Sequence, residues 1–303
     1  MRRPSPAWFD AQYDNRARIP EHPAILKHWF EASVQARACH ADLVEQAYGP
    51  TPRERLDVFP ARASSSPVLV YLHGGYWRAL DKRDQSFVAP LFVDAGALVV
   101  LPDYALCPAV TIEQIVLQTV QALAWVHRHA AQYGGDPDRI VVAGHSAGGH
   151  LATMLLACDW TAVAPDLPAD VVKAALSISG LYELGPLRRA PFLAPDLRLT
   201  AASARRLSPA TMPAPPRGAL VTVVGGDESE EFLRQAALIS RAWGPRCVIA
   251  AETVVRRNHM DVLHELAEPS TRTHRLALQL LGLMPLSPGR SIATADSAKP
   301  SLR

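Results

Sequence analysis

Apolar residues occur along this 303-residue chain as short unbroken runs, separated by longer stretches in which they recur with helical spacing. Unbroken apolar runs are typical of strands that are buried on both faces of a parallel sheet. We predict such strands at residues 68–72, 97–101, 139–143, 174–179, 219–224 and 247–255. Residues 55–60 alternate between apolar and polar side chains, which predicts an edge strand.

The stretches between the runs predict helices. They lie at residues 83–95, 111–133, 229–243 and 271–281, and a further helix begins near residue 147. Because strands and helices alternate, we expect an α/β fold with a mostly parallel, doubly wound sheet that is flanked by helices.

The segments outside this alternation are assigned as follows. Residues 1–48 form an N-terminal helical segment whose helix covers residues 23–47, with Pro23 in its first turn, and which packs beside or over the sheet. Residues 180–216 are rich in proline and arginine and predict an insertion near the active site. Residues 1–284 then make a single domain, and the composition of residues 285–303 predicts a disordered tail.

Composition and charge exclude several classes of partner. The chain has 31 basic and 29 acidic residues, a net charge of +2, so we expect no binding to nucleic acid or to an anionic membrane. The four cysteines are far apart and have no metal-ligand spacing, which is typical of reduced thiols. No apolar run has the length of a signal-peptide core or a membrane span. We therefore expect a cytoplasmic protein.

The motif with the clearest chemistry is Gly144-His145-Ser146-Ala147-Gly148. Gly-x-Ser-x-Gly alone is a weak signal, but here it joins a predicted strand to a predicted helix. A serine at such a turn has a strained backbone and projects its hydroxyl from the sheet edge, and the glycines let strand and helix approach closely. We therefore predict that Ser146 is a nucleophile at a nucleophile elbow.

A serine hydroxyl needs a base within hydrogen-bond reach, and the base needs an acid that orients it. In folds with this elbow the order along the chain is serine, acid, histidine. Four histidines follow Ser146, of which His150, His264 and His274 fall on predicted helices, where packing or solvent exposure explains them. His259 follows the last strand in a loop, and we predict that it is the general base.

The acid is predicted from the strand that ends at Gly225-Gly226. Asp227 and Glu228 both follow it, and either could reach His259. The residues alone leave both open, and aspartate is the commoner third member of such triads.

The tetrahedral intermediate carries an oxyanion that backbone N–H groups stabilise. We expect one donor at Ala147, directly after the nucleophile, and the others in the turn of Gly74, Gly75 and Tyr76, where glycine allows close approach. His73 is interpreted as a hydrogen-bonding residue that fixes this turn. No metal-binding motif is present in the sequence, so we expect no metal and no cofactor.

With these residues assembled, the chain resembles the kynurenine formamidases (arylformamidases), a family of α/β-hydrolases related to the hormone-sensitive-lipase-like esterases. The resemblance covers about residues 12–281. It rests on His73-Gly74-Gly75-Tyr76-Trp77, where many related esterases have a third glycine, and on segments 144–152, 179–184 and 229–235. The tryptophan after the glycines is its most specific element.

The resemblance implies an α/β-hydrolase fold and moves the acid to Glu228, because family members carry an acid directly before a Ser-x-Glu-Phe segment, here Ser229-x-Glu231-Phe232. The sequence departs from the family at Glu230, where proline is frequent, and at Met260, which replaces a common phenylalanine.

The activity that the resemblance implies is hydrolysis of N-formyl-L-kynurenine or a related aryl formamide, in tryptophan catabolism. Tyr76 and Trp77 are then expected to wall the substrate pocket, with a core role for Trp77 as the alternative. Two other functions stay open: a carboxylesterase for small acyl esters, and a non-catalytic ligand-binding relative. A small-molecule formamide or ester is the expected partner, and a homodimer is left open.

Overall fold

A single eight-stranded sheet forms the centre of the molecule, in the order β1-β2-β4-β3-β5-β6-β7-β8. The computed structural model describes residues 4–285. The strands are β1 Val44–Ala47, β2 Arg55–Phe59, β3 Ser66–Leu72, β4 Leu98–Pro102, β5 Gly135–His145, β6 Val172–Ile178, β7 Ala219–Gly225 and β8 Val248–Val254. The six strands from β4 to β8 in this order pair in parallel, whereas β1 and β2 run antiparallel to their neighbours. The predicted mostly parallel sheet is confirmed.

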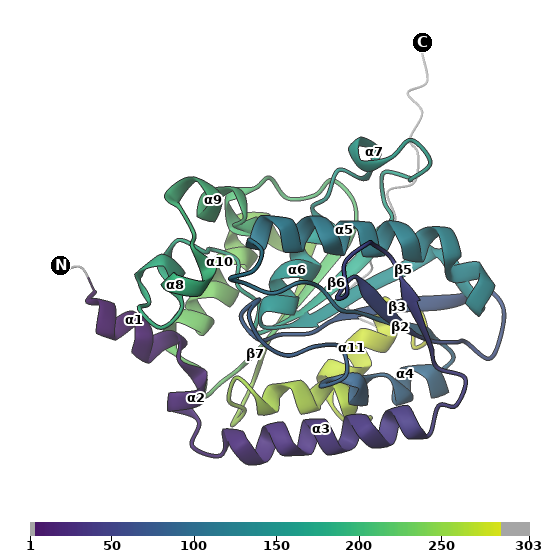
Figure 1. The fold of residues 1–303 in the computed structure, drawn as a ribbon, viewed down its shortest axis with the longest axis horizontal. Coiled ribbons are helices and arrows are strands. Elements are labelled where there is room, and N and C mark those ends of the chain that lie inside the picture. The colour runs from purple at the N-terminus through teal and green to yellow at the C-terminus, as the bar shows by residue number, and fades with distance from the viewer. Residues whose placement is uncertain (1–3, 286–303) are drawn as a thin grey trace, which may run out of the picture.

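Helices cover both faces of this sheet, with α5, α6 and α10 on one side and α3, α4 and α11 on the other (Figure 1). The α-helices are α1 Pro6–Tyr13, α2 Asn15–Arg18, α3 His22–Ala38, α4 Pro90–Asp94, α5 Ile112–His129, α6 Ala147–Leu156, α7 Trp160–Val163, α8 Ala194–Leu197, α9 Ala201–Arg206, α10 Glu230–Cys247 and α11 Arg272–Leu280. Short 3₁₀ helices lie at η1 Ser86–Val88, η2 Ala130–Tyr133, η3 Pro186–Arg189, η4 Pro209–Thr211 and η5 Asp261–Ala267.

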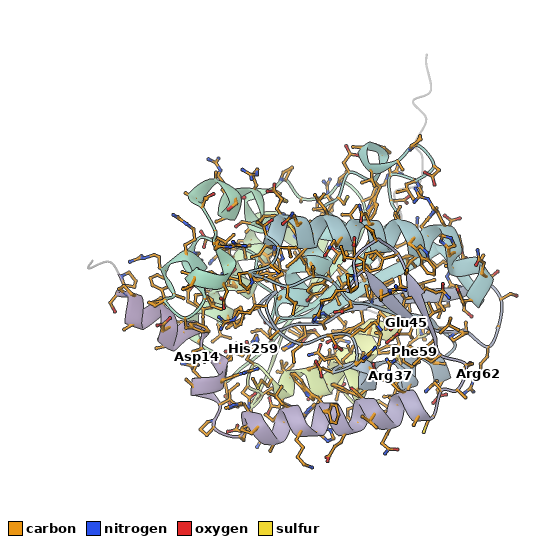
Figure 2. All side chains as sticks on the ribbon, in the orientation of Figure 1. Asp14, Arg37, Glu45, Phe59, Arg62 and His259 are labelled. Atoms are coloured by element: carbon orange, nitrogen blue, oxygen red, sulfur yellow. The ribbon has the colours of Figure 1, made fainter. Side chains whose placement is uncertain are left out.

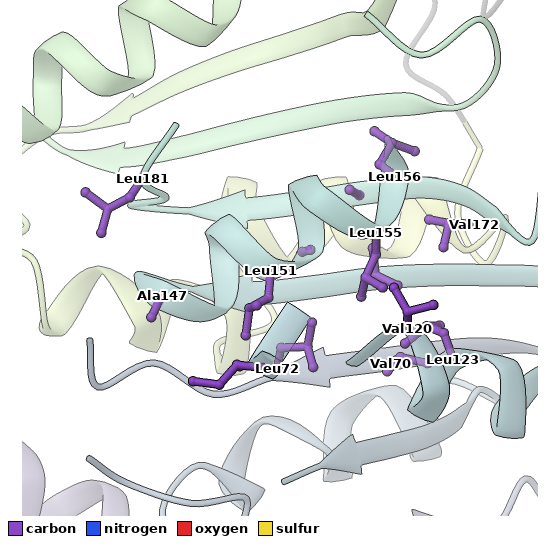
Figure 3. Packing of buried hydrophobic residues seen from close by; sticks show 14 of the residues in the cluster. Val70, Leu72, Val120, Leu123, Ala147, Leu151, Leu155, Leu156, Val172 and Leu181 are labelled. Carbon is purple, nitrogen blue, oxygen red and sulfur yellow. The ribbon is translucent and has the colours of Figure 1, made fainter. Parts of the chain in front are cut away.

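The side chains of the central strands alternate between two cores, one on each face. In one core, α6 packs with Leu151 and Leu155 toward Val70 and Leu72 of β3 (Figure 3). Trp29 of α3 belongs to the core on the opposite face. Because the central strands are buried on both faces, they carry the unbroken apolar runs by which the sequence predicts them.

The predicted helix over residues 23–47 is wrong at its C-terminal end. Helix α3 ends at Ala38, and Val44–Ala47 forms the edge strand β1, which pairs with β2. The alternation of residues 55–60 predicted an edge strand, but β2 lies between β1 and β4 and is therefore not at the edge of the sheet. Four residues of alternating polarity fit the end of a helix or a short strand. Here they form a strand because β2 offers them backbone hydrogen bonds.

Ion pairs on β2 hold these N-terminal elements in place. The carboxylate of Asp57 is fully buried and binds both Arg37 of α3 and the ammonium of Lys82, at 2.8 Å for the latter. Lys82 also binds Glu45 of β1 at 2.5 Å. Arg37 of α3 and Glu45 of β1 are labelled in Figure 2.

A further prediction needs correction. The helix predicted over residues 83–95 is instead the short pair η1 and α4, because Pro90 lacks the N–H that an uninterrupted helix needs there and can only begin a new one. The predicted insertion at residues 180–216 contains η3, α8, α9 and η4.

Apart from residue 285, the tail predicted at residues 285–303 lies outside the described residues. Within residues 4–285, no helix combines the length and the apolar character that crossing a membrane requires.

Candidate active site

Ser146 lies at a sharp turn between β5 and α6. Its φ of 57° is in the left-handed region, which is unfavourable for a residue with a side chain. A Cβ atom on Gly144 would lie 2.3 Å from the carbonyl oxygen of Gly148, and one on Gly148 would lie 2.0 Å from the carbonyl oxygen of Leu72. The two glycines are therefore required for the close contact of strand and helix.

Three side chains from distant parts of the chain form one hydrogen-bonded series. The Nε2 atom of His259 lies 3.0 Å from the hydroxyl of Ser146, and its Nδ1 lies 2.6 Å from Oε2 of Glu228. All three residues are buried, and the carboxylate of Glu228 is fully buried. When Nδ1–H donates to Glu228, Nε2 is free to accept the hydroxyl proton of Ser146.

The structure separates the two candidate acids. Besides His259, Glu228 accepts the N–H of Gly225 at 2.7 Å and the hydroxyl of Ser179 at 2.5 Å, both on Oε1. Among the described residues, Glu228 and not Asp227 has a hydrogen bond to His259, although both acids line a polar cavity of about 280 Å³. The geometry thus favours Glu228, as the family resemblance did.

Two aromatic rings hold the imidazole of His259. The ring of Phe232 lies 4.2 Å from it, and the ring of His145 lies 4.9 Å from it on the neighbouring segment. Burial lowers the pKa of His145 to about 3, so this ring is neutral. The Nε2 atom of His145 lies 2.7 Å from the backbone carbonyl oxygen of His259, so the neutral ring carries its proton on Nε2 and donates it to this oxygen.

Backbone N–H groups are available beside Ser146. Among residues 4–285, the N–H groups of Gly75, Tyr76 and Ala147 have no hydrogen-bond acceptor. A Cβ on Gly74 would lie 3.4 Å from the Cβ of Ser146, so this turn passes close to the nucleophile. Gly75 has a φ of +100°, a conformation that glycine adopts without strain. The arrangement can stabilise negative charge next to Ser146.

Polar contacts of His73 and of its partner Asp103 fix this turn. His73 binds Asp103 at 3.1 Å and stacks on the ring of Tyr104, with the ring centroids 4.2 Å apart. Arg53 donates to the same Asp103 at 2.7 Å and to the backbone carbonyl of Leu80 at 2.8 Å. These contacts agree with the interpretation of His73 as a residue that fixes the turn.

The N-terminal segment also binds this turn, through the hydroxyl of Tyr76. The hydroxyl of Tyr76 donates to the backbone carbonyl of Tyr13 at 2.7 Å and lies 3.3 Å from the amide of Asn15. Burial raises the pKa of Tyr76 well above its ordinary value, so the hydroxyl stays protonated and can donate. Tyr13 in turn donates to Glu231 of α10 at 2.6 Å.

A cavity of about 680 Å³ opens over Ser146 and His259. Its apolar walls include Leu26, Trp29 and Phe192. Four charged residues also line it: Asp14 and Arg16 at the start of α2, Arg78 after the glycine turn, and Asp196 in the insertion. Asp14 and His259, which both line this cavity, are labelled in Figure 2. A somewhat larger groove of about 740 Å³ lies between α3 and α4 and contains none of the predicted site residues.

Trp77 does not wall this cavity. It is fully buried, and its ring packs edge-on against His150, with the centroids 5.0 Å apart. The pocket role expected for Trp77 is therefore wrong, and the alternative core role fits its position. Tyr76, the other expected wall residue, does line the cavity.

The side chains of the other three histidines that follow Ser146 form hydrogen bonds elsewhere. His150 binds the carbonyl oxygen of Leu207 at 2.8 Å, and burial lowers its pKa to about 4. His264 accepts the indole N–H of Trp29 at 2.9 Å, and His274 contacts the carbonyl of Leu266. Within residues 4–285, no group of three or more histidine, cysteine, aspartate or glutamate side chains could hold a metal ion.

Sequence reasoning missed two residues of this site. The sequence analysis gives no role to Ser179, which holds Glu228 and lies in the segment 179–184 that carries the family resemblance. It also gives no role to Tyr13, which binds both α10 and the glycine turn. A serine directly after a parallel strand was the available signal for Ser179, since such strand ends meet at the site.

Comparison with protein families and known proteins finds relatives that are formamidases and esterases. The family model BD-FAE matches residues 56–162, which include both the glycine turn and the elbow. The kynurenine formamidase of Danio rerio is 29% identical over 274 residues, covering 87% of this chain and 89% of the relative. The esterase LipQ of Mycobacterium tuberculosis is 35% identical over 148 residues, covering 45% of this chain and 35% of that protein.

Solved structures confirm the α/β-hydrolase fold. A protein from Silicibacter sp. TM1040, provisionally named a thioesterase, superimposes with a TM-score of 0.77 at 31% identity, covering 87% of this chain and 96% of that one. An esterase from Pyrobaculum calidifontis superimposes with a TM-score of 0.64 at 20% identity, covering 86% of this chain and 93% of that one. With formamidases and esterases as relatives, the chain is a hydrolase.

Proposed function

Because the chain belongs to the kynurenine formamidase family of α/β-hydrolases, we propose that it is a serine hydrolase that cleaves N-formyl-L-kynurenine or a related aryl formamide to formate and the free arylamine. The observation that carries the proposal is the hydrogen-bonded series from Ser146 through His259 to Glu228 at the base of the cavity. In tryptophan catabolism, this reaction would supply kynurenine.

In the first half of the reaction, the hydroxyl oxygen of Ser146 attacks the formyl carbon while its proton passes to Nε2 of His259. The negative charge that develops on the formyl oxygen is stabilised by the N–H groups of Ala147, Gly75 and Tyr76. His259 then gives its proton to the aryl nitrogen, the carbon–nitrogen bond breaks, and the arylamine leaves.

In the second half, water attacks the formyl group that is now bound to Ser146. His259 takes a proton from this water and returns it to the serine oxygen as the carbon–oxygen bond to the enzyme breaks. The products are formate and the regenerated hydroxyl. Glu228 holds the imidazole in the tautomer that both halves need and stabilises its protonated form.

A carboxylesterase for small acyl esters is the second candidate. It uses the same residues and the same steps, with an alcohol as the leaving group. The esterase relatives support it, as does a cavity of about 680 Å³, which has room for acyl groups larger than formyl. Non-catalytic binding is the weakest candidate, because the proposed nucleophile, base and acid are all present.

The test compares hydrolysis of N-formyl-L-kynurenine with that of p-nitrophenyl acetate and butyrate by the purified chain. We expect formate release from the formamide, and we expect Ser146→Ala to lower kcat about a thousandfold or more. Turnover of the esters with the formamide untouched would leave the carboxylesterase. Absence of any turnover, together with failure of a fluorophosphonate to label Ser146, would exclude both enzymes.

A further inference from the structure

The carboxylate of Glu228 is held by three donors that approach its two oxygens unequally. Oε2 faces only Nδ1 of His259, whereas Oε1 accepts both the N–H of Gly225 at 2.7 Å and the hydroxyl of Ser179 at 2.5 Å. Among the described residues this carboxylate is the sole hydrogen-bond partner of the Ser179 hydroxyl. Ser179 is buried and does not line the cavity over Ser146.

The backbone at Ser179 is unusual for a residue with a side chain. Its φ is +50°, a conformation that favours glycine. Its N–H is fixed by the carbonyl oxygen of Val223 on β7 at 2.7 Å, directly after β6 ends. Strained residues of this kind persist where the surrounding structure over-determines them, and they cluster at functional sites.

We propose that Ser179 is a positioning residue that acts through Glu228. Two donors on Oε1 fix the rotation of the carboxylate, and this rotation keeps Oε2 in line with Nδ1 of His259. With Gly225 as the only donor on Oε1, the carboxylate can rotate about its terminal bond, and the imidazole is no longer held for Ser146. The inference rests on the proposed function, since it assigns Ser179 a role only if Glu228 orients the base.

Two substitutions separate this role from a structural one. Ser179→Ala removes the hydroxyl and keeps the strained backbone, whereas Ser179→Gly removes the hydroxyl and relieves the strain. We expect both variants to lower kcat by about tenfold to a hundredfold, the factor that corresponds to a lost hydrogen bond to a charged group, with KM unchanged. We expect Ser179→Gly to melt at the wild-type temperature or above it.

A double-mutant cycle tests whether Ser179 acts through Glu228. In a Glu228→Ala background the hydroxyl has no carboxylate to hold, so Ser179→Ala is expected to change the rate less than twofold. The readouts are kcat for p-nitrophenyl acetate and the second-order rate constant for fluorophosphonate labelling of Ser146. Thr222→Val is the matched control, because it removes a buried hydroxyl of the same sheet that has no hydrogen-bond partner among residues 4–285.

The outcomes are distinct. Wild-type kcat in Ser179→Ala, or the same loss of rate with and without Glu228, would overturn the inference. A loss of activity in Ser179→Gly that follows a fall in melting temperature would overturn it too. If wild-type protein is not labelled at Ser146, the proposed function fails first, which separates the two failures.

Discussion

Replacing Glu228 with glutamine tests the assignment of the acid most directly. The side chain keeps its size, but one of its two oxygens becomes an NH₂ group, which can only donate. In the wild type, the N–H of Gly225 donates to Oε1 at 2.7 Å. An NH₂ group at the Oε1 position would place two donors against each other in a buried site. At the Oε2 position it would face Nδ1 of His259.

The second orientation is the less costly one, because His259 can change its tautomer whereas the N–H of Gly225 cannot change its role. A buried unsatisfied donor costs about 1–3 kcal/mol. With NH₂ facing Nδ1, the ring proton moves to Nε2, and Nε2 can no longer accept the proton of Ser146. In serine proteases the equivalent tautomer error lowers kcat about ten-thousandfold, which corresponds to about 5.5 kcal/mol of transition-state stabilisation.

The assay is steady-state hydrolysis of p-nitrophenyl acetate and of N-formyl-L-kynurenine by wild type and Glu228→Gln, with circular dichroism as the check on folding. We expect a loss of about a thousandfold to ten-thousandfold in kcat. Asp227→Asn is the matched control, and it should stay within about threefold of wild type since its carboxylate has no bond to His259. A rate for Glu228→Gln within tenfold of wild type would refute the reasoning.

Two further predictions follow from the site. Gly74→Ala should lower kcat at least tenfold, because the new Cβ would lie 2.9 Å from the carbonyl oxygen of His145 and would push the turn away from Ser146; an unchanged rate would contradict the oxyanion role of this turn. Burial lowers the pKa of His145 to about 3 and that of His150 to about 4, below the unfolded value, so the stability they contribute is complete above about pH 6.5 and is lost as pH falls. Urea unfolding should show a loss of about 2 kcal/mol for each ring between pH 7 and 5, with a smaller loss in His150→Gln.

The sequence predicts the centre of the fold well because the central strands are buried on both faces. Each of the runs at residues 68–72 and 219–224 became part of a parallel strand, β3 and β7. The periphery was less predictable, since β1 is a four-residue edge strand whose pattern also fits the end of a helix. Its conformation depends on pairing with β2, which a local pattern does not contain.

In the candidate site, too, some residues could be predicted from the sequence and others depend on the three-dimensional structure. Ser146 and His259 were predicted from motif and chain order, and the structure brings them to within 3.0 Å. The choice between Asp227 and Glu228 could not be made from composition, because only the turn after β7 decides which neighbouring side chain faces inward. Trp77 was misassigned because adjacent residues of a tight turn point in opposite directions, one into the cavity and one into the core.

The short stretch from Asp14 to Ala17 has a consequence for enzyme engineering. It supplies four neighbouring residues to the cavity wall, while the nucleophile, the base and the acid all come from residues 146–259. Substrate preference can therefore be altered by exchanging one contiguous surface peptide, with the bond-breaking groups left untouched. Asn15 is the member to retain in such libraries, since it also contacts the hydroxyl of Tyr76.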